Sequence, residues 1–352
     1  MVTSGIIQKL SIRNSVVFFT SQYKGMKSEE VHKNLKIIRR GSIFTVYIHA
    51  IAYMLRNRDF DFVIESVSTV PFFSSILFGD RGIIIPHHLM GRLVFGELPF
   101  YKAIFAYTAE KLIPPLYKKS QFIAVSKYVS KVLSKKGIPE DHIHIAHPST
   151  SRMFDTLCKR RRYSKFSTPT VLVISRLMRY KRVGLLIKLF SRLPKSIGAR
   201  LIIIGSGKER KKLEKLASKL GVQNRVNFVG SVSEERKIYF LRRSWVFAFT
   251  SRIEGFGIIA IEAQKCGVPV VAFGVGGIPE AVKNGYSGFV INEEDEEDFV
   301  DKLAMLLASK KLRERMSHNA IRNSKKFIWT EIPNTVCKII SQKGPAQSTG
   351  PR

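Results

Sequence analysis

The sequence alternates short Val- and Ile-rich runs with helical patterns along most of its length. The runs are SVVFF, DFVIES, GIIIP, QFIAVS and IHIA in the first half, and TVLVIS, RLIIIG, VNFVG, WVFAFT, VPVVAF and GFVI in the second. Such continuous apolar runs are typical of strands buried on both faces of a parallel sheet. Helical segments such as GKERKKLEKLASKLG, which ends at Gly221, lie between the runs. The alternation predicts an α/β protein with two doubly wound domains.

The domain boundary is expected near CKRRRYSKFSTPT, a basic stretch with little apolar periodicity. We therefore predict a first domain over residues 1–160 and a second over 161–326. A length of 352 residues suits two domains of ordinary size. Ligands of open α/β sheets bind beyond the carboxyl ends of the strands, so a cleft between two such domains is the expected site.

Charge is the unusual feature of the composition. The chain has 59 Lys and Arg against 27 Asp and Glu, a net charge of +32. Such an excess favours polyanionic partners, namely nucleic acid, an anionic membrane surface or phosphorylated ligands, although a general basic bias is an alternative. No apolar run is long enough for a transmembrane helix, and the start resembles no signal peptide. Three scattered cysteines indicate neither a disulfide framework nor a zinc site and favour a cytoplasmic setting.

Several loops that follow strands in the second half carry chemically suitable residues. VISRLMRYKR places Arg176 and Lys181 just after a strand, where a guanidinium and an ammonium suit a diphosphate. A solvated basic turn is the alternative. Gly205, in IIIGSG, allows backbone amides to approach an anion, which is weak support on its own. Val232, in VNFVGSV, could line a nucleotide base or belong to a packed loop.

The stretch SRIEGFGIIAIEAQKCGVPVVAF predicts a loop, a helix, a glycine stop and a strand. Gly255 and Gly257 allow tight backbone approach. The amides of Phe256–Ile258 are expected to be N-terminal donors suited to a phosphate. Glu262 on the helix could accept hydrogen bonds from a vicinal diol such as a ribose, and Glu254 in the loop from a second polyol. A pair of solvated carboxylates is the alternative.

The order of these motifs resembles a known family. ISRLMRYK, IIIGSG, VNFVGSV, EGFGIIAIEAQKCGVPVVAF, GGIPEAV and NGYSGFVI follow one another as in the donor-binding half of family 4 retaining glycosyltransferases, also called glycosyl transferases group 1. The first half resembles the family more weakly, through FDFVIESVSTVPFF, GIIIPHHL and FIAVSKYVSKVLSKKGIPEDHIHIAHPS. The resemblance implies the GT-B fold, two Rossmann-like domains facing across a cleft.

The resemblance also implies roles for individual residues. Arg176 and Lys181 match the positions that bind the donor diphosphate and stabilise it as a leaving group. Glu262 matches the ribose-binding glutamate, and Glu254 the glutamate that contacts the transferred sugar. His87 matches the first-domain histidine beside the sugar better than His88 does. The implied catalytic residues are therefore His87, Arg176, Lys181 and Glu254.

Further expectations follow from the same resemblance. Residues 1–160 would be the acceptor-side domain, lacking the family's first strand and Gly-rich loop, so that hydrogen-bonding edges and apolar surface are exposed. Residues 161–326 would bind the nucleotide sugar, 327–342 would form a helix returning to the first domain, and 343–352 a polar tail. The implied reaction is metal-independent and needs no cofactor, and it moves a hexose from a UDP- or GDP-linked donor to a glycan or lipid-linked acceptor.

Two other classes of function remain open at this stage. A non-catalytic polyanion or nucleic-acid binder is favoured by charge alone, and no nucleic-acid-binding motif supports it. A nucleotide-sugar epimerase could use the same fold. The charge and the segment LVFGELPFYKAIFAYTAEKLIPPLYKK suggest a cytoplasmic protein with peripheral membrane association, although a buried amphipathic helix is an alternative. The sugar, the base, the acceptor and the oligomeric state are not predicted.

Overall fold

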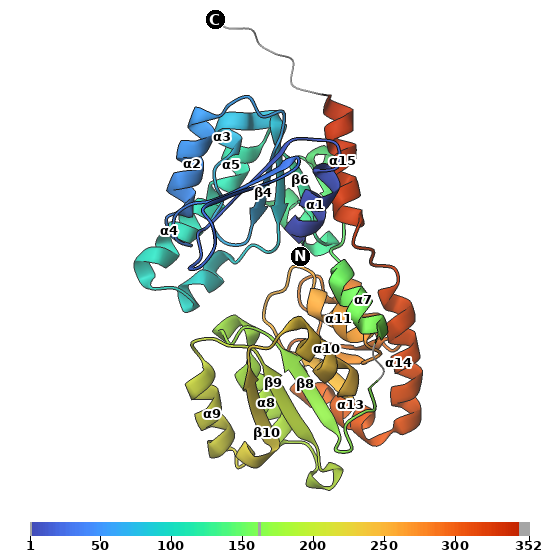
Figure 1. Ribbon diagram of the computed structural model, residues 1–352. Coiled ribbons are helices and arrows are strands. Elements are labelled where there is room, and N and C mark those ends of the chain that lie inside the picture. The colour runs from blue at the N-terminus through green and yellow to red at the C-terminus, as the bar shows by residue number, and fades with distance from the viewer. Residues whose placement is uncertain (1, 161–162, 345–352) are drawn as a thin grey trace, which may run out of the picture. The chain divides into compact units, whose positions relative to one another are not determined.

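The computed structural model describes residues 2–160 and 163–344, and it divides the chain into two compact units (Figure 1). The first unit comprises Met1–Arg92, Phe100–Pro148 and Trp329–Arg352. The second comprises Leu93–Pro99 and Ser149–Ile328. The two units are described separately below.

These boundaries differ from the sequence prediction in two places. Helix α7 (Arg152–Arg160) belongs to the second unit, because its Asp155 accepts a 2.8 Å hydrogen bond from Lys265 of that unit. The short segment 93–99 also belongs to the second unit, although the sequence places it within the first half. Helix α15 (Glu331–Lys343), expected over residues 327–342, belongs to the first unit. Of the predicted polar tail, residues 345–352 lie outside the described residues.

The second unit is built on a parallel sheet in the strand order β10-β9-β8-β11-β12-β13. Relative to the chain this order is third, second, first, fourth, fifth, sixth, as in the Rossmann fold. The strands are β8 (Thr170–Ile174), β9 (Arg200–Ile204), β10 (Val226–Gly230), β11 (Val246–Phe249), β12 (Val270–Phe273) and β13 (Gly288–Ile291). Chain direction across the sheet reverses between β8 and β11, and this switch point is where such folds bind ligands.

Helices cover this sheet and bury its apolar side chains. The helices are α8 (Val183–Ser191), α9 (Arg210–Lys219), α10 (Glu234–Arg243), α11 (Ile258–Lys265), α12 (Ile278–Ala281), α13 (Glu296–Ala308) and α14 (Lys310–Ser324), beside α7. The side-chain oxygens of Ser233, Asp295 and Ser309 cap the N-termini of α10, α13 and α14. In the core, Phe247, Phe273 and Phe299 are fully buried. Burial on both sheet faces explains the unbroken Val and Ile runs.

The first unit contains two sheets among its described residues. One is parallel, in the order β4-β5-β6-β7, and the other has the order β1-β3-β2. The strands are β1 (Val16–Thr20), β2 (Glu29–His32), β3 (Leu35–Arg39), β4 (Val63–Val67), β5 (Gly82–Pro86), β6 (Gln121–Ala124) and β7 (Ile143–Ile145). Strands β1 and β4 each pair on one side only, and all five residues of β1 are half-buried. Exposed edges and apolar surface were expected in this region.

The helices of the first unit follow the strands and cover the sheets. They are α1 (Val2–Leu10), α2 (Val46–Arg56), α3 (Ser75–Phe78), α4 (Phe100–Lys111), α5 (Ile113–Tyr117) and α6 (Lys127–Lys135), beside α15. The 3-10 helices of the chain are η1 (Gly79–Arg81), η2 (Gly91–Gly96), η3 (Glu140–His142), η4 (Arg179–Lys181), η5 (Lys195–Ile197) and η6 (Gln223–Arg225). The serine of SKYV, Ser126, caps α6 through the Val129 amide at 3.1 Å.

The sequence analysis did not predict the hairpin of β2 and β3. The two strands pair antiparallel, with His32 opposite Leu35, and Lys33 takes a positive φ of 52° in the turn. Charged side chains line β2, which carries Glu29 and Glu30, so the apolar pattern typical of a strand is weak. Arg39 of β3 stabilises the hairpin through a 2.7 Å ion pair with Glu30.

Glycines allow the loops after the strands of the second unit to contact one another through their backbones. A Cβ at Gly205 would overlap the carbonyl oxygen of Ser175, and one at Gly276 would overlap the carbonyl oxygen of Glu254. The amide of the adjacent Gly277 donates to the same Glu254 oxygen at 3.1 Å. These contacts fix the loops that surround the switch point, because neither backbone can move away from the other without losing them.

We expect Gly276→Ala to destabilise the chain much more than Gly285→Ala. Both glycines have similar positive φ values, 58° and 70°, but a Cβ at Gly285 meets nothing within 4 Å. The backbone conformation alone should cost about 1–2 kcal/mol at either position. The clash with Glu254 should bring the cost at Gly276 to about 3 kcal/mol or more. Denaturant unfolding of the two variants measures the difference, and equal losses would contradict the role of the contact.

Candidate functional site

Two loops meet at the switch point of the second unit. One follows β8 and contains η4, and the other follows β11 and leads to α11. The Arg252 amide donates a 2.7 Å hydrogen bond to the Tyr180 carbonyl oxygen, and Lys181 Nζ lies 2.6 Å from Glu254 Oε2. The Thr250 hydroxyl also donates to the Arg182 carbonyl at 3.1 Å. The structure therefore brings the predicted lysine and the predicted loop glutamate into direct contact.

Arg176 differs from the other cations of its loop. Lys181 pairs with Glu254, Arg182 with Glu293, and Arg179 with Glu209. The exposed Arg176 instead donates a 2.6 Å hydrogen bond to the Tyr180 hydroxyl, and it forms no ion pair with any carboxylate in the part of the chain that the structure describes. An anion that entered this loop would therefore find one positive charge not yet neutralised.

The loop after β11 ends in a helix N-terminus. Gly257 has φ 92° and caps α11, and the Phe256 ring is buried against Phe327 with its centroid 5.2 Å away. The buried ring holds the loop in place and presents its backbone. Because the first amides of a helix lack intrahelical acceptors, those at Ile258 and the next residues can donate to an anion. Gly255 lies in the same loop and is also buried.

Glu262 lies on α11 and is almost completely buried, with 1% of its surface exposed. Its Oε2 lies 2.8 Å from Lys237 Nζ of α10. Burial raises the pKa of Glu262 to about 7, although Lys237 acts in the opposite direction. Burial alone would lower the pKa of Lys237, but Glu262 and Glu234 outweigh it and raise that pKa. The predicted ribose-binding carboxylate thus already has one oxygen engaged.

Gly205 and Val232 lie in neighbouring loops of the same sheet. The Gly205 amide donates to the Gly230 carbonyl at 2.8 Å, and the Ser231 hydroxyl donates to Ser206 at 3.0 Å. These bonds join the loops after β9 and β10. Gly205 is required by its close approach to Ser175, so packing explains it without a ligand. Val232 is half-buried, immediately before the α10 cap.

His87 lies in the first unit, directly after β5. Its Nε2 lies 2.8 Å from the Ser66 hydroxyl, and its amide donates to the Val67 carbonyl at 2.9 Å. Burial lowers the pKa of His87 to about 4, with a further contribution from His88. The imidazole is therefore neutral near pH 7 and can donate or accept one hydrogen bond. The other predicted site residues all belong to the second unit.

Glu97 is a site residue that the sequence analysis missed. It lies in the 93–99 segment, and its side chain is 5% exposed. Its Oε1 accepts a 2.7 Å hydrogen bond from the Tyr180 amide, while Oε2 lies 3.3 Å from Lys208 Nζ in the Gly-rich turn after β9. Glu97 thus holds the basic loop against that turn. No local pattern could have found it, because it lies 83 residues before Tyr180.

Two negative findings concern only the residues that the structure describes. No group of three or more His, Cys, Asp or Glu side chains could hold a metal ion there. No described helix combines the length and the apolar character that a membrane crossing requires.

The fold and this site define a class of protein, the GT-B glycosyltransferases. The solved structure of sucrose-phosphate synthase from Thermosynechococcus elongatus is similar, with a TM-score of 0.76 and 17% identity, over 97% of this chain and 92% of that chain. The glycosyltransferase WaaG gives a TM-score of 0.71, 17% identity, and coverage of 97% and 95%. Anabaena HepE, solved with UDP and glucose, gives 0.65, 19% identity, and 88% and 87%.

The sequence comparisons then identify the family. The model of glycosyl transferases group 1 matches residues 159–323, so this part of the chain belongs to that family. The D-inositol 3-phosphate glycosyltransferase of Corynebacterium jeikeium is 33% identical over 195 residues, 53% of this chain and 46% of the relative. That of Mycobacteroides abscessus is 35% identical over 181 residues, 50% and 39%. The chain therefore spans about half the length of these curated relatives, or less.

The raised pKa of Glu262 predicts a pH-dependent stability. Folding takes up a proton where the folded pKa, about 7, exceeds the ordinary value of 4.5. The contribution of Glu262 is therefore fully present below about pH 4.5 and is lost as pH rises through about 7. Relative to Glu262→Gln, the wild type should lose roughly 2–3 kcal/mol between pH 5 and 8. Urea unfolding across that range measures the difference.

Glu235→Gln is the control for this experiment, because Glu235 is an exposed carboxylate on the neighbouring helix α10. Its stability should follow that of the wild type across the pH range. A Glu262→Gln variant with the same pH profile as the wild type would contradict the raised pKa.

Proposed function

We propose that the chain transfers a hexose from a nucleotide-diphosphate sugar to a glycan or lipid-linked acceptor, with retention of configuration and without a metal. The observation that supports this most is the meeting of Arg176, Lys181, Glu254 and the α11 N-terminus at the switch point of the second unit. Cations and helix amides that converge at such a position suit a diphosphate. The acceptor hydroxyls and the transferred sugar would require carboxylates, which the same loops carry.

In this proposal the diphosphate is stabilised by side-chain charge. The Arg176 guanidinium, which has no carboxylate partner among the described residues, would bind the diphosphate first. Lys181 would turn from Glu254 toward the phosphate oxygens, a small movement for a flexible ammonium. The α11 amides would add donors that need no reorganisation. Donors placed where charge develops on the leaving group are usually the largest catalytic contribution.

The carboxylates would orient the sugars. Once Lys181 moves, Glu254 is free to accept hydrogen bonds from the transferred hexose. Glu262 would accept from the ribose with Oε1, while Oε2 remains with Lys237. The neutral His87 would contact the hexose from the first unit. By analogy with the family, the leaving phosphate itself would take the proton of the attacking hydroxyl on the same face.

A UDP-linked hexose is the first donor to test, with a GDP-linked donor as the second. The similar structure of Anabaena HepE was solved with UDP and glucose, and the structure titled TarM holds UDP. UDP-glucose should therefore be offered with and without acceptors. An anomeric configuration in the product that matches the donor, together with unchanged rates in a chelator, would support retention and metal independence. A new nucleotide sugar formed without acceptor would instead identify an epimerase.

Lys181→Ala should weaken UDP binding by tenfold or more and lower kcat/KM for UDP-glucose by about 10²–10³. The change removes one phosphate donor and leaves the Glu254 carboxylate unpaired beside the anion. Calorimetric titration with UDP and a donor-hydrolysis assay measure the two effects. Lys188→Ala is the matched control, because Lys188 is an exposed lysine on α8 outside the loops. Intact UDP binding in Lys181→Ala would overturn the site assignment.

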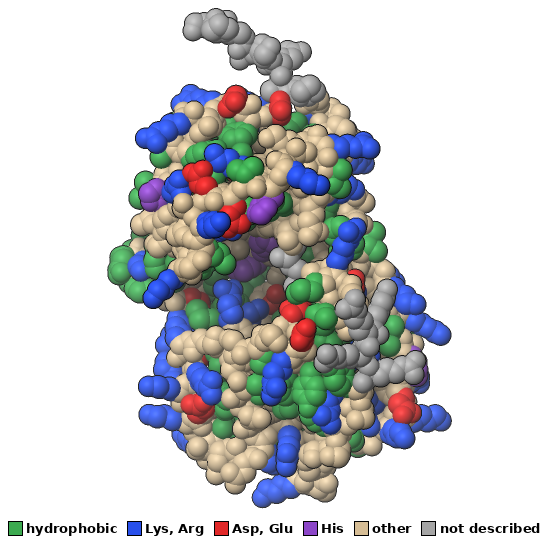
Figure 2. Space-filling model, in the orientation of Figure 1, with side chains coloured by type: hydrophobic (Ala, Val, Ile, Leu, Met, Phe, Trp, Pro, Cys, Tyr) green, Lys and Arg blue, Asp and Glu red, His purple; other side chains and the backbone are tan. Residues whose placement is uncertain are grey.

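We further propose that the first unit binds an anionic membrane surface through α4. The α4 surface consists of exposed apolar side chains, with Phe100 73%, Tyr101 69% and Phe105 59% exposed. Lys102 Nζ lies 4.0 Å from the centroid of Phe44, which is 61% exposed, so the loop before α2 continues this surface. Figure 2 shows hydrophobic side chains gathered over α4 beside Lys and Arg. Aromatic rings with adjacent lysines suit the interface of an anionic bilayer.

The full chain should sediment at low salt with vesicles that contain phosphatidylserine, and less with phosphatidylcholine alone. Replacing Phe100 and Phe105 together by Ser should reduce binding about tenfold or more, because each ring contributes roughly 1.5–3 kcal/mol when buried. The control is Met305→Ser with Ile321→Ser, two exposed apolar residues of the second unit. A chain that stays wholly unbound at low salt would contradict the membrane role.

A further inference from the structure

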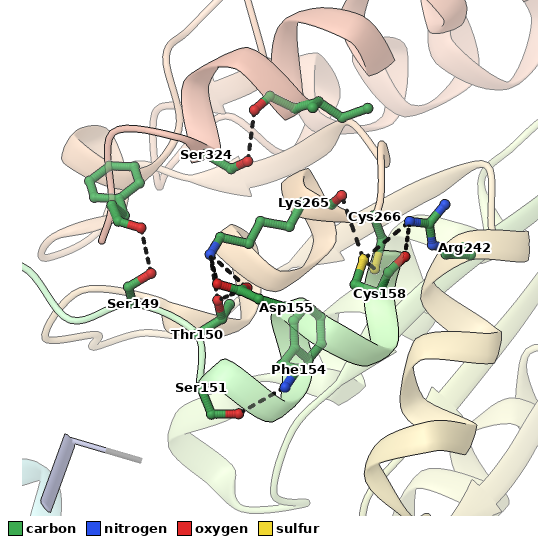
Figure 3. Close-up of polar contacts among 12 residues, drawn as sticks. Ser149, Thr150, Ser151, Phe154, Asp155, Cys158, Arg242, Lys265, Cys266 and Ser324 are labelled. Carbon is green, nitrogen blue, oxygen red and sulfur yellow. Dashed lines mark hydrogen bonds and ion pairs between the residues drawn. The ribbon is translucent and has the colours of Figure 1, made fainter. Parts of the chain in front are cut away.

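The two buried cysteines of the second unit lie against each other. Cys158 Sγ and Cys266 Sγ are 3.5 Å apart, although 108 residues separate them in sequence (Figure 3). Both are free thiols, 5% and 6% exposed. The third cysteine, Cys337, lies on α15 in the first unit. The sequence analysis expected three unrelated cysteines, so the proximity is a finding of the structure.

A guanidinium lies beside this pair. Arg242 Nη2 lies 3.3 Å from Cys158 Sγ and also donates to the Cys158 carbonyl oxygen. Arg242 forms no ion pair with a carboxylate within residues 2–160 and 163–344. The nearby Lys165 is also without one there, and donates to the Ser244 carbonyl at 2.7 Å. The Cys158 sulfur is therefore the group that can supply a negative charge to this buried basic cluster.

The two thiols differ in their acidity. The hydrogen bond from Cys266 and the charge of Arg242 outweigh burial and lower the pKa of Cys158 to about 6. Burial and the adjacent Cys158 sulfur raise the pKa of Cys266 well above its ordinary value. Near pH 7 the pair therefore consists of a Cys158 thiolate, which is the nucleophilic form of cysteine, and a Cys266 thiol.

The pair connects two elements near the candidate site. Cys158 lies on α7, and Cys266 is the C-terminal cap of α11, the helix that carries Glu262. Beside it, Lys265 Nζ contacts Thr150 at 2.5 Å and Asp155 at 2.8 Å, so polar contacts already hold the end of α11 to the start of α7 (Figure 3).

We propose that Cys158 and Cys266 are a redox modification site that takes a small peroxide as oxidant and closes to a disulfide. Three features of the structure support it: the short distance between the sulfurs, the guanidinium directed at one of them, and the placement of the second as a resolving thiol. Their low exposure restricts the site to small oxidants such as hydrogen peroxide.

The reaction balances in two steps. The Cys158 thiolate attacks one peroxide oxygen, an S–O bond forms, the O–O bond breaks, and hydroxide leaves. Cys266 then loses its proton and attacks the sulfur of the Cys158 sulfenic acid, so that an S–S bond forms and the S–O bond breaks. The departing hydroxide takes a proton and leaves as water. Overall, two thiols are oxidised to one disulfide and one hydrogen peroxide is reduced to two waters.

Closure would move the end of α11. The sulfurs must approach from 3.5 Å to the roughly 2.05 Å of a disulfide, which draws Cys266 toward α7 by up to about 1.5 Å. Glu262 lies one helical turn before Cys266, so its contact with Lys237 would change as well. If the proposed function holds, oxidation therefore alters donor binding without any change in the loop residues themselves.

The test is oxidation of the reduced full chain with hydrogen peroxide at pH 7, followed by peptide mapping. We expect a Cys158–Cys266 linked peptide, with Cys337 still reduced. In Cys266→Ser, the Cys158 sulfenic acid should persist long enough to be captured by dimedone. Arg242→Gln should slow the oxidation of Cys158 by roughly tenfold, because it raises the thiol pKa. Arg236→Gln, an exposed arginine of the same helix, should have no effect.

Three results would overturn the proposal: oxidation of Cys337 as fast as Cys158, oxidation of Cys158 without a link to Cys266, or an unchanged rate in Arg242→Gln. A second measurement separates this proposal from the proposed function. The oxidised chain should bind UDP several-fold differently from the reduced chain, and dithiothreitol should reverse the change. A chain that forms the disulfide but binds no UDP in either state would leave the redox pair standing and contradict the proposed function.

Discussion

The contact between the loops after β8 and β11 is the interaction on which the site depends. The sheet places these strands side by side although 71 residues lie between their ends, and their connections leave in opposite directions. Two loops at this position would diverge unless something joined them. The Arg252 amide and the Lys181–Glu254 ion pair join them. The remaining contacts, from Gly276 on one side and Glu97 on the other, hold each loop in the geometry that this junction needs.

Much of the fold could be predicted from the sequence because its strongest signal is local. A strand buried on both faces must be apolar along its whole length, so all eleven runs chosen for that property are strands. The hairpin of β2 and β3 was missed because its stability comes from pairing and from ion pairs such as Arg39–Glu30. The domain boundary was misplaced for a similar reason. Helix α7 adjoins the basic boundary segment, and only Lys265, more than a hundred residues later, assigns it to the second unit.

The candidate site shows the same limit. Its loop residues could be predicted because each follows a recognisable strand, and a known family has the same order of motifs. The partners could not be predicted. Lys237, which engages Glu262, belongs to a helix with no motif, and Glu97 belongs to the other half of the sequence. The predicted role of Gly205 was also incomplete, because the Ser175 carbonyl requires a glycine there whether or not a ligand is bound.

The net charge of +32 acquires a more specific meaning at this site. Most cations of the switch-point loops are already neutralised: Lys181 by Glu254, Arg182 by Glu293 and Lys208 by Glu97. A bound diphosphate would therefore exchange one ion pair for another rather than simply add charge. Because Lys181 is nearly buried, leaving it unpaired during that exchange would be costly, and the phosphate must arrive as Glu254 departs. The same exchange frees the Glu254 carboxylate for sugar hydroxyls. Phosphate binding and sugar recognition would then be two consequences of one movement.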